Sequence, residues 1–134
     1  APQDNSILGL TSVIAPIIMT GNATIVMPSP SAPIPAITLA ECLATSDVPA
    51  GVVNILTGAP AEVMPWLAEH ADVNAVDLTG IVDDAVAADL ERQAAGSVKR
   101  VRQPKPHASW DATPSLTRIR TFTETKTVWH PFGT

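Results

Sequence analysis

The amino-acid sequence predicts an α/β fold in which helices alternate with the strands of a parallel sheet. Strands are expected over residues 23–27, 52–56, 75–78 and 99–102, and the first of them is a short apolar run rich in β-branched residues, which is the pattern of a strand buried on both faces. Segments with apolar residues at helical spacing lie between these expected strands, and this alternation is typical of βαβ units. Hydrophobic residues make up 46% and charged residues 16% of the 134 positions, which excludes a disordered chain.

The first helix is expected over residues 6–19, where apolar residues recur at helical spacing and a Gly-Asn pair follows as a stop signal. The first strand, 23–27, lies between that pair and a proline-rich turn. A second helix is expected over residues 36–45, because Pro33 or Pro35 can occupy its first turn. Together these segments predict one helix before the first strand and one after it.

The second strand, 52–56, ends in a Thr-Gly pair and is followed by a third helix over residues 61–69. On this helix Val63, Trp66 and Leu67 are predicted to face inward.

The third strand, 75–78, also ends in a Thr-Gly pair, and a fourth helix is expected over residues 82–95. Asp83 and Asp84 lie near the start of this helix, where negative charge suits the positive end of the helix dipole. Residues 99–102 then predict a fourth strand.

The residue pattern of the sequence changes after the fourth predicted strand. Prolines break up a loop that carries Trp110, residues 116–121 can form one helical turn, and residues 125–129 alternate as a strand does. A strand behind a proline-rich connection is often used to pair with another sheet or subunit. We therefore divide the chain into a domain over residues 1–104 and a tail over residues 105–134.

Charge divides the chain in a similar way. Residues 1–91 contain eleven acidic residues and no Lys or Arg, whereas residues 92–134 contain all eight Lys and Arg and two acidic residues. The two parts carry −11 and +6, which gives the net charge of −5. Residues 1–91 are not expected to bind nucleic acid, because contacts with phosphate need Lys or Arg and this segment has neither. We expect the basic segment to pack on the acidic domain of its own chain or of a partner.

The single cysteine, Cys42, excludes an internal disulfide framework and a zinc site built from cysteines. Cys42 has apolar neighbours on the predicted second helix and no cation in its segment, so we expect a buried structural thiol rather than a nucleophile. The apolar run over residues 7–19 is too short to span a membrane and has no basic segment before it. A soluble, cytoplasmic protein that does not bind membranes is therefore expected.

No residue pattern marks a catalytic or metal-binding residue. His70, His107 and His130 lie far apart and share no metal-ligand spacing, so packing or helix-dipole roles are expected for them. The Thr-Gly pairs at 57–58 and 79–80 end strands, where α/β proteins bind nucleotides, but neither belongs to a glycine-rich phosphate motif. By themselves these pairs are interpreted as ordinary turns.

Four segments in order resemble motifs of the aldehyde dehydrogenase superfamily. Residues 21–29, GNATIVMPS, are similar to its GNTVVxKPSE, and residues 48–58, VPAGVVNILTG, are similar to its LPPGVVNVVTG. Residues 69–80, EHADVNAVDLTG, resemble its HPDVxxVxFTGS, and residues 122–129, FTETKTVW, resemble its C-terminal YTExKTVW. The first three cover most of residues 7–80 with the family's spacing.

The resemblance implies a Rossmann-like NAD(P)-binding domain followed by an oligomerisation strand. In the family a catalytic domain lies between the third and fourth motifs, but here only residues 81–121 separate them. The family's nucleophilic cysteine lies in that domain, and Cys42 falls instead in the helix after the first motif. The resemblance therefore implies a shortened relative with no catalytic residue.

Several of the cofactor-binding residues that the resemblance implies are replaced in this sequence. Met27 and Pro30 stand where the family has a Lys and a Glu that hold the ribose hydroxyls, and neither side chain can replace those hydrogen bonds. Further family positions are changed at Pro60, Met64, Leu78, Ile81 and Pro104. Tight cofactor binding is expected to be lost, whereas the retained Ser29, Thr79 and Gly80 leave weak NAD or NADP binding as an alternative.

Two functions follow as hypotheses. The leading one is a non-catalytic structural or regulatory subunit that assembles through residues 121–130 with itself or with a full-length aldehyde dehydrogenase. The alternative is an aldehyde oxidoreductase subunit or fragment that still binds NAD(P), with catalysis completed by another chain or by residues outside this sequence. A nucleic-acid role for the basic tail is rejected, because Arg118, Arg120 and Lys126 belong to no recognised motif.

Overall fold

Helices and strands alternate along the chain as the sequence predicts. A computed structural model describes residues 1–2, 4–103 and 115–131. The helices are α1 (Leu8–Ile18), α2 (Ile34–Ala44), α3 (Pro60–Glu69), α4 (Asp84–Ala95) and α5 (Leu116–Thr121), and the strands are β1 (Thr24–Val26), β2 (Val53–Ile55), β3 (Ala75–Asp77) and β4 (Arg100–Arg102). Trp110 and His107 lie outside the described residues.

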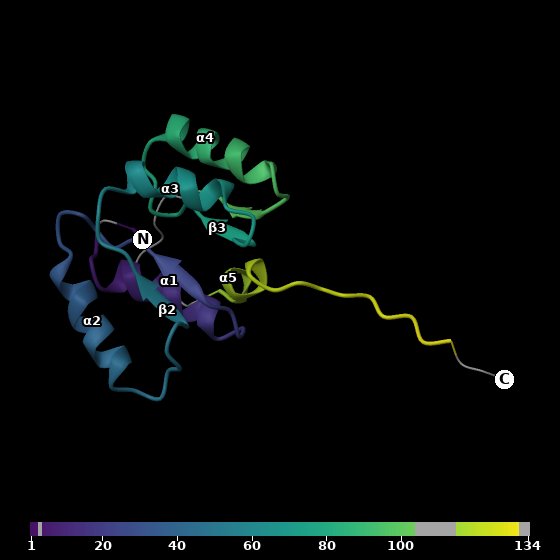
Figure 1. The fold of residues 1–134 in the computed structure, drawn as a ribbon, viewed down its shortest axis with the longest axis horizontal. Coiled ribbons are helices and arrows are strands. Elements are labelled where there is room, and N and C mark those ends of the chain that lie inside the picture. Colours follow the sequence, from purple (N-terminus) through teal and green to yellow (C-terminus); the bar gives the residue numbers. More distant parts are fainter. Residues whose placement is uncertain (3, 104–114, 132–134) are drawn as a thin grey trace.

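The strands pair in parallel, which confirms the predicted α/β class, but within the described residues they form two sheets (Figure 1). Strand β1 pairs with β2, with Thr24 opposite Val53, and β3 pairs with β4, with Val76 opposite Val101. Strands β1 and β3 are therefore both edge strands of their sheets.

Each sheet packs on its own apolar cluster, which positions its strand ends. Buried residues of α1, β1 and α2 form the first cluster: Leu10, Val13, Ile14, Val26 and Ala36. The second cluster joins α3, β3 and α4 through Ala68, Val76, Leu78, Ala87, Leu90 and Ala94. Burial of these apolar side chains is the main favourable term that holds the helices on the strands.

The predicted end signals of α3 and α4 are confirmed. The Asp83 carboxylate accepts hydrogen bonds from the backbone N–H groups of Ala85 at 2.8 Å and Val86 at 3.3 Å, so it caps α4. His70 directly follows Glu69, the last residue of α3, and caps the C-terminal end of the helix through its backbone N–H, which donates to the carbonyl oxygen of Trp66. Within the described residues, no helix combines the length and the apolar character needed to cross a membrane.

Two side chains predicted to be buried are exposed. Cys42 is exposed, because it lies six residues after the buried Ala36 and thus about 240° around α2 from the face that packs inward. Trp66 is 75% exposed, because it lies two residues from the buried Ala68, about 200° around α3. Both predictions were wrong about which face of the helix packs on the sheet.

The strand predicted over residues 125–129 does not form. Residues 123–131 have no helical or strand structure, and they run away from the body of the molecule after α5 (Figure 1). A strand needs a neighbour for its backbone hydrogen bonds, and no described part of the chain lies beside this segment to supply one. The predicted turn over residues 116–121, in contrast, is the helix α5.

Candidate functional site

The candidate site lies where the chain leaves the carboxyl ends of β1, β2 and β3. In open parallel sheets this edge is where ligands bind. The segments that follow the strands contain the three residues predicted to contact a cofactor: Ser29 after β1, and Thr79 and Gly80 after β3.

Ser29 borders a small crevice between the segments that follow β1 and β2. The crevice has a volume of about 120 Å³ and is lined by Pro28, Ser29, Pro30, Pro33, Thr57 and Gly58. Ser29 is only 2% exposed, and its hydroxyl shares a 2.9 Å hydrogen bond with the hydroxyl of Ser31. Neither Thr79 nor Gly80 lines this crevice, so the structure does not bring the three predicted residues to one cavity.

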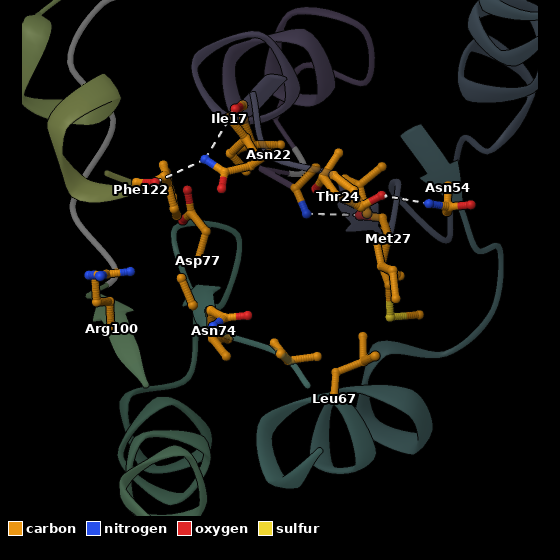
Figure 2. Close-up of a pocket in the computed structure, with 18 of the residues that line it drawn as sticks. Ile17, Asn22, Thr24, Met27, Asn54, Leu67, Asn74, Asp77, Arg100 and Phe122 are labelled. Carbon is orange, nitrogen blue, oxygen red and sulfur yellow. Dashed lines mark hydrogen bonds between the residues drawn. The ribbon is translucent and has the colours of Figure 1, made fainter. Parts of the chain in front are cut away.

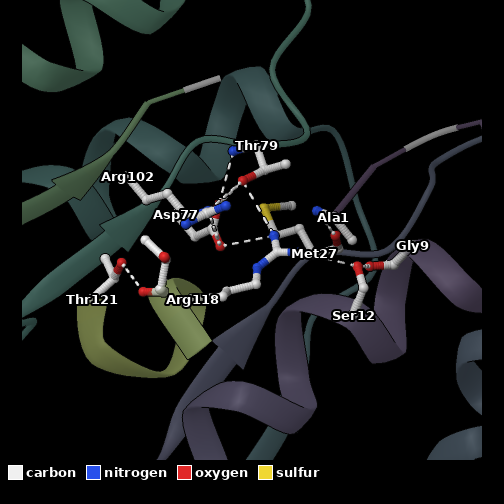
Figure 3. A network of polar contacts seen from close by, with 10 residues as sticks. Ala1, Gly9, Ser12, Met27, Asp77, Thr79, Arg102, Arg118 and Thr121 are labelled. Atoms are coloured by element: carbon white, nitrogen blue, oxygen red, sulfur yellow. Dashed lines mark hydrogen bonds and ion pairs between the residues drawn. The ribbon is translucent and has the colours of Figure 1, made fainter. Parts of the chain in front are cut away.

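Thr79 belongs to a network of polar side chains (Figure 3). Its hydroxyl donates to the carboxylate of Asp77 and accepts hydrogen bonds from Arg118 Nη2 at 3.2 Å and Arg102 Nε at 3.3 Å. The carboxylate of Asp77 also forms an ion pair with Arg118 at 3.2 Å, and both side chains are largely buried. The Thr79 hydroxyl is thus already used by the chain itself.

Arg118 comes from α5 in the basic part of the chain, whereas Asp77 belongs to the acidic part. Arg118 Nη1 also donates to the hydroxyl of Ser12 on α1 at 3.4 Å, so its side chain joins α5, β3 and α1. This contact confirms the expectation that the basic segment packs on the acidic domain of its own chain. Sequence reasoning identified Thr79 but missed its partners Asp77, Arg102 and Arg118, and the charge division was the one signal that pointed to them.

Gly80 allows a close approach of the first residue of the chain. A Cβ atom on Gly80 would overlap the backbone carbonyl of Ala1, so no larger residue fits without a shift. The Ala1 amino group donates to the carbonyl oxygen of Met27 at 2.8 Å. Burial lowers the pKa of this amino group below its ordinary value; Asp77 opposes that change and Arg118 adds to it.

A larger cavity of about 490 Å³ lies between β1 and β3 (Figure 2). Its walls include residues 22–27 on one side and residues 72–77 on the other, with Leu67 of α3 and Phe122 at the end of α5. The Asn22 side chain donates to the carbonyl oxygen of Phe122 at 2.9 Å, which fixes the end of α5 at the rim. This cavity was not predicted, because a single continuous sheet would leave no space there.

The donor set does not fit tight binding of a dinucleotide. Met27 is buried and its thioether cannot donate a hydrogen bond to a ribose hydroxyl, and Pro30 offers no carboxylate at the small crevice. Within the described residues, no group of three or more His, Cys, Asp or Glu side chains is placed to hold a metal ion.

Comparisons with known proteins agree with the fold. The model of the aldehyde dehydrogenase family matches residues 2–103. A crystal structure of an aldehyde dehydrogenase from Bartonella henselae is 31% identical, with a TM-score of 0.62 over 68% of this chain. One from Brucella melitensis biovar abortus 2308 is 28% identical, with a TM-score of 0.61 over 68% of this chain. The chain spans only 19% and 18% of the lengths of these two proteins.

Proposed function

The chain belongs to the aldehyde dehydrogenase family, and we propose that it works as a non-catalytic structural or regulatory subunit. In this proposal it assembles with itself or with a complete aldehyde dehydrogenase through residues 121–130. Its support comes from the position of the one thiol, from the use of the Thr79 hydroxyl by the chain itself, and from the exposed tail.

The position of Cys42 supports the proposal that this chain is not catalytic. Helix α2 leaves the carboxyl end of β1 and returns to the amino end of β2, and Cys42 lies near the C-terminal end of this helix. The thiol is therefore at the opposite end of the sheet from Ser29 and Gly80. A nucleophile must lie within reach of the bound substrate, so Cys42 does not meet this geometric requirement.

The exposed tail supports the proposal that this chain assembles with a partner. Val128 is 68% exposed and Trp129 is 87% exposed on a segment that has no strand partner. A large aromatic side chain in water is a common anchor of protein interfaces.

Size-exclusion chromatography with light scattering tests this proposal, with the chain alone and mixed with a complete aldehyde dehydrogenase. We expect an oligomer, or a complex with the enzyme, that is lost in the double variant Val128→Asp and Trp129→Ser. The variant Val82→Asp is the matched control, because Val82 is 89% exposed but lies outside the tail. The proposal would be overturned if the chain were monomeric and did not bind the complete aldehyde dehydrogenase under any condition.

The alternative function is a subunit or fragment that still binds NAD(P), the cofactor that the family generally uses. One observation favours it: Ser29, Thr79 and Gly80 all follow the carboxyl ends of parallel strands. Bound there, the cofactor would supply hydride acceptance, while this chain would contribute only binding groups. Calorimetry with NAD and NADP tests it, and the absence of heat at millimolar cofactor would end this alternative.

A further inference from the structure

The carboxyl ends of β1 and β3 mark the place where the order of the strands reverses. Strand β1 pairs with β2 on one side, β3 pairs with β4 on the other, and β1 and β3 face each other across the larger cavity. The chain therefore crosses from these two strands in opposite directions. In open α/β folds the crevice outside such a pair of strand ends is where ligands bind, and here the segment after β3 brings Thr79 to it.

The guanidinium group of Arg118 occupies this crevice (Figure 3). Its Nη2 atom lies 3.2 Å from the Asp77 carboxylate and donates to the Thr79 hydroxyl at 3.2 Å. Its Nη1 atom donates at 3.4 Å to the hydroxyl of Ser12, which lies on α1, the helix before β1. Arg118 thus bridges the crevice from the β3 side to the β1 side, and its side chain is only 16% exposed.

We infer that α5 acts as an autoinhibitory strap: while Arg118 is in place the crevice is closed to a nucleotide, and it opens when α5 detaches. The inference rests on the alternative function, weak NAD(P) binding, and names the contact that keeps the binding weak. A nucleotide phosphate at Thr79 and a docked α5 exclude each other, because both need the same hydroxyl group and the same space. The apparent affinity for the nucleotide is then the intrinsic affinity multiplied by the fraction of molecules in which the crevice is open.

Helix α5 is attached without a buried residue of its own. None of its residues is buried, and Phe122, which directly follows it, is the buried apolar side chain at this end. The Asn22 side chain donates to the carbonyl oxygen of Phe122 at 2.9 Å and adds one more polar contact. A helix of six residues is not stable in water by itself, so we expect α5 to unfold when Arg118 loses its contacts.

The Asp77 carboxylate keeps a cation when Arg118 leaves. Arg102 lies 3.9 Å from the same carboxylate, and its Nε atom donates to the Thr79 hydroxyl at 3.3 Å. Arg102 belongs to β4, which is paired with β3 whether α5 is docked or not. A buried carboxylate without any cation would strongly oppose opening, and Arg102 removes that obstacle.

The closed state also leaves one hydrogen-bond donor of Arg118 unused. Within the described residues, the Arg118 Nε atom is buried and has no hydrogen-bond partner. A buried donor that loses its hydrogen bond to water and gains none in the protein is unfavourable. Water can satisfy the same N–H when α5 is detached. This cost lowers the stability of the closed state relative to the open state, as a strap that a nucleotide can displace requires.

Calorimetry with NAD and NADP tests the strap in the unsubstituted chain, in Arg118→Gln and in Arg120→Gln. Arg120→Gln is the matched control, because it removes the same charge from an exposed position of α5. We expect weak binding, in the millimolar range, by the unsubstituted chain and by the control, and binding about tenfold tighter by Arg118→Gln. Equal affinities in the two variants overturn the inference. Weaker binding by Arg118→Gln also overturns it, because Arg118 would then hold the nucleotide instead of excluding it.

Amide hydrogen exchange of the unsubstituted chain gives a second readout that does not depend on the folding of a variant. The N–H groups of Phe122 and Thr123 donate to Ile119 O and Arg120 O while α5 is docked. Cofactor at a concentration that gives binding heat should speed their exchange severalfold and leave α4 unchanged. Unchanged or slower exchange overturns the strap, whereas the binding heat still supports the alternative function. The absence of heat from the unsubstituted chain at millimolar cofactor overturns both.

Discussion

At the scale of single residues, Arg118 makes contacts that no other basic residue in the described part of the tail, residues 115–131, makes. It joins Asp77, Thr79 and Ser12, with Asp77 and Arg118 side chains only 10% and 16% exposed. Replacement by Gln leaves a largely buried carboxylate without its main cation. We expect Arg118→Gln to lower the free energy of unfolding by about 1.5–3 kcal/mol, measured by urea denaturation.

Arg120→Gln is the matched control for that variant, because it removes the same charge from an exposed position of the same helix. A change within about 0.5 kcal/mol is expected. Equal losses in the two variants would show that net charge, and not the contact with Asp77, stabilises α5.

Cys42 gives a second prediction at this scale. Because the thiol is exposed on α2, it should react with Ellman's reagent in the native protein as completely as in urea. A thiol that reacts only after unfolding would support the buried position that the sequence predicts. Helix α2 explains why sequence patterning was wrong here: apolar residues occur on all its sides, so periodicity does not indicate which side packs inward.

Gly80 gives a third prediction for a single residue. An added Cβ would meet the backbone of Ala1, so Gly80→Ala should destabilise the fold by about 1–3 kcal/mol in urea denaturation. Gly96→Ala is the control, since its Cβ would have only one neighbour, at 3.4 Å, and its φ of −58° suits alanine. If Gly80→Ala were no more destabilising than Gly96→Ala, the close approach of Ala1 would be contradicted.

At the scale of elements, the start of α4 depends on one cap. Asp83→Ala should cost about 0.5–2 kcal/mol of stability, because the backbone N–H groups of Ala85 and Val86 lose their acceptor. Asp83→Asn should restore most of that loss, because an amide oxygen also accepts. Thermal denaturation of the three proteins measures the order, and an Asn variant as unstable as the Ala variant would rule out the cap as the cause.

Local signals in the sequence were sufficient for the elements up to residue 103. The Thr-Gly pair at 57–58, the prolines before α2 and the Asp83 cap each act within a few residues, so they predict where strands and helices end. The meeting of Arg118 with Asp77 depends on tertiary packing across 41 positions, which no local pattern encodes. The gap between β1 and β3 was missed for the same reason, since it is a property of how two packed units meet.

At the scale of the whole molecule, the basic segment, residues 92–134, contacts the acidic segment, residues 1–91. The basic segment reaches the acidic part through Arg118 at 3.2 Å and Arg102 at 3.9 Å, and both ion pairs share the carboxylate of Asp77. Residues 1–91 carry a net charge of −11, so they attract the basic segment over a longer range than these two ion pairs.

Salt should weaken this attraction. We expect the free energy of unfolding to fall as sodium chloride rises, because ions screen charges separated by more than about 10 Å at 0.1 M. Largely buried pairs are screened less, so the fall should be partial, and Arg118→Gln should make it smaller. Urea denaturation at low and high salt measures both effects. Stability that does not change with salt in the unsubstituted chain would mean that apolar packing, such as that of Phe122, holds the basic segment in place without help from its charge.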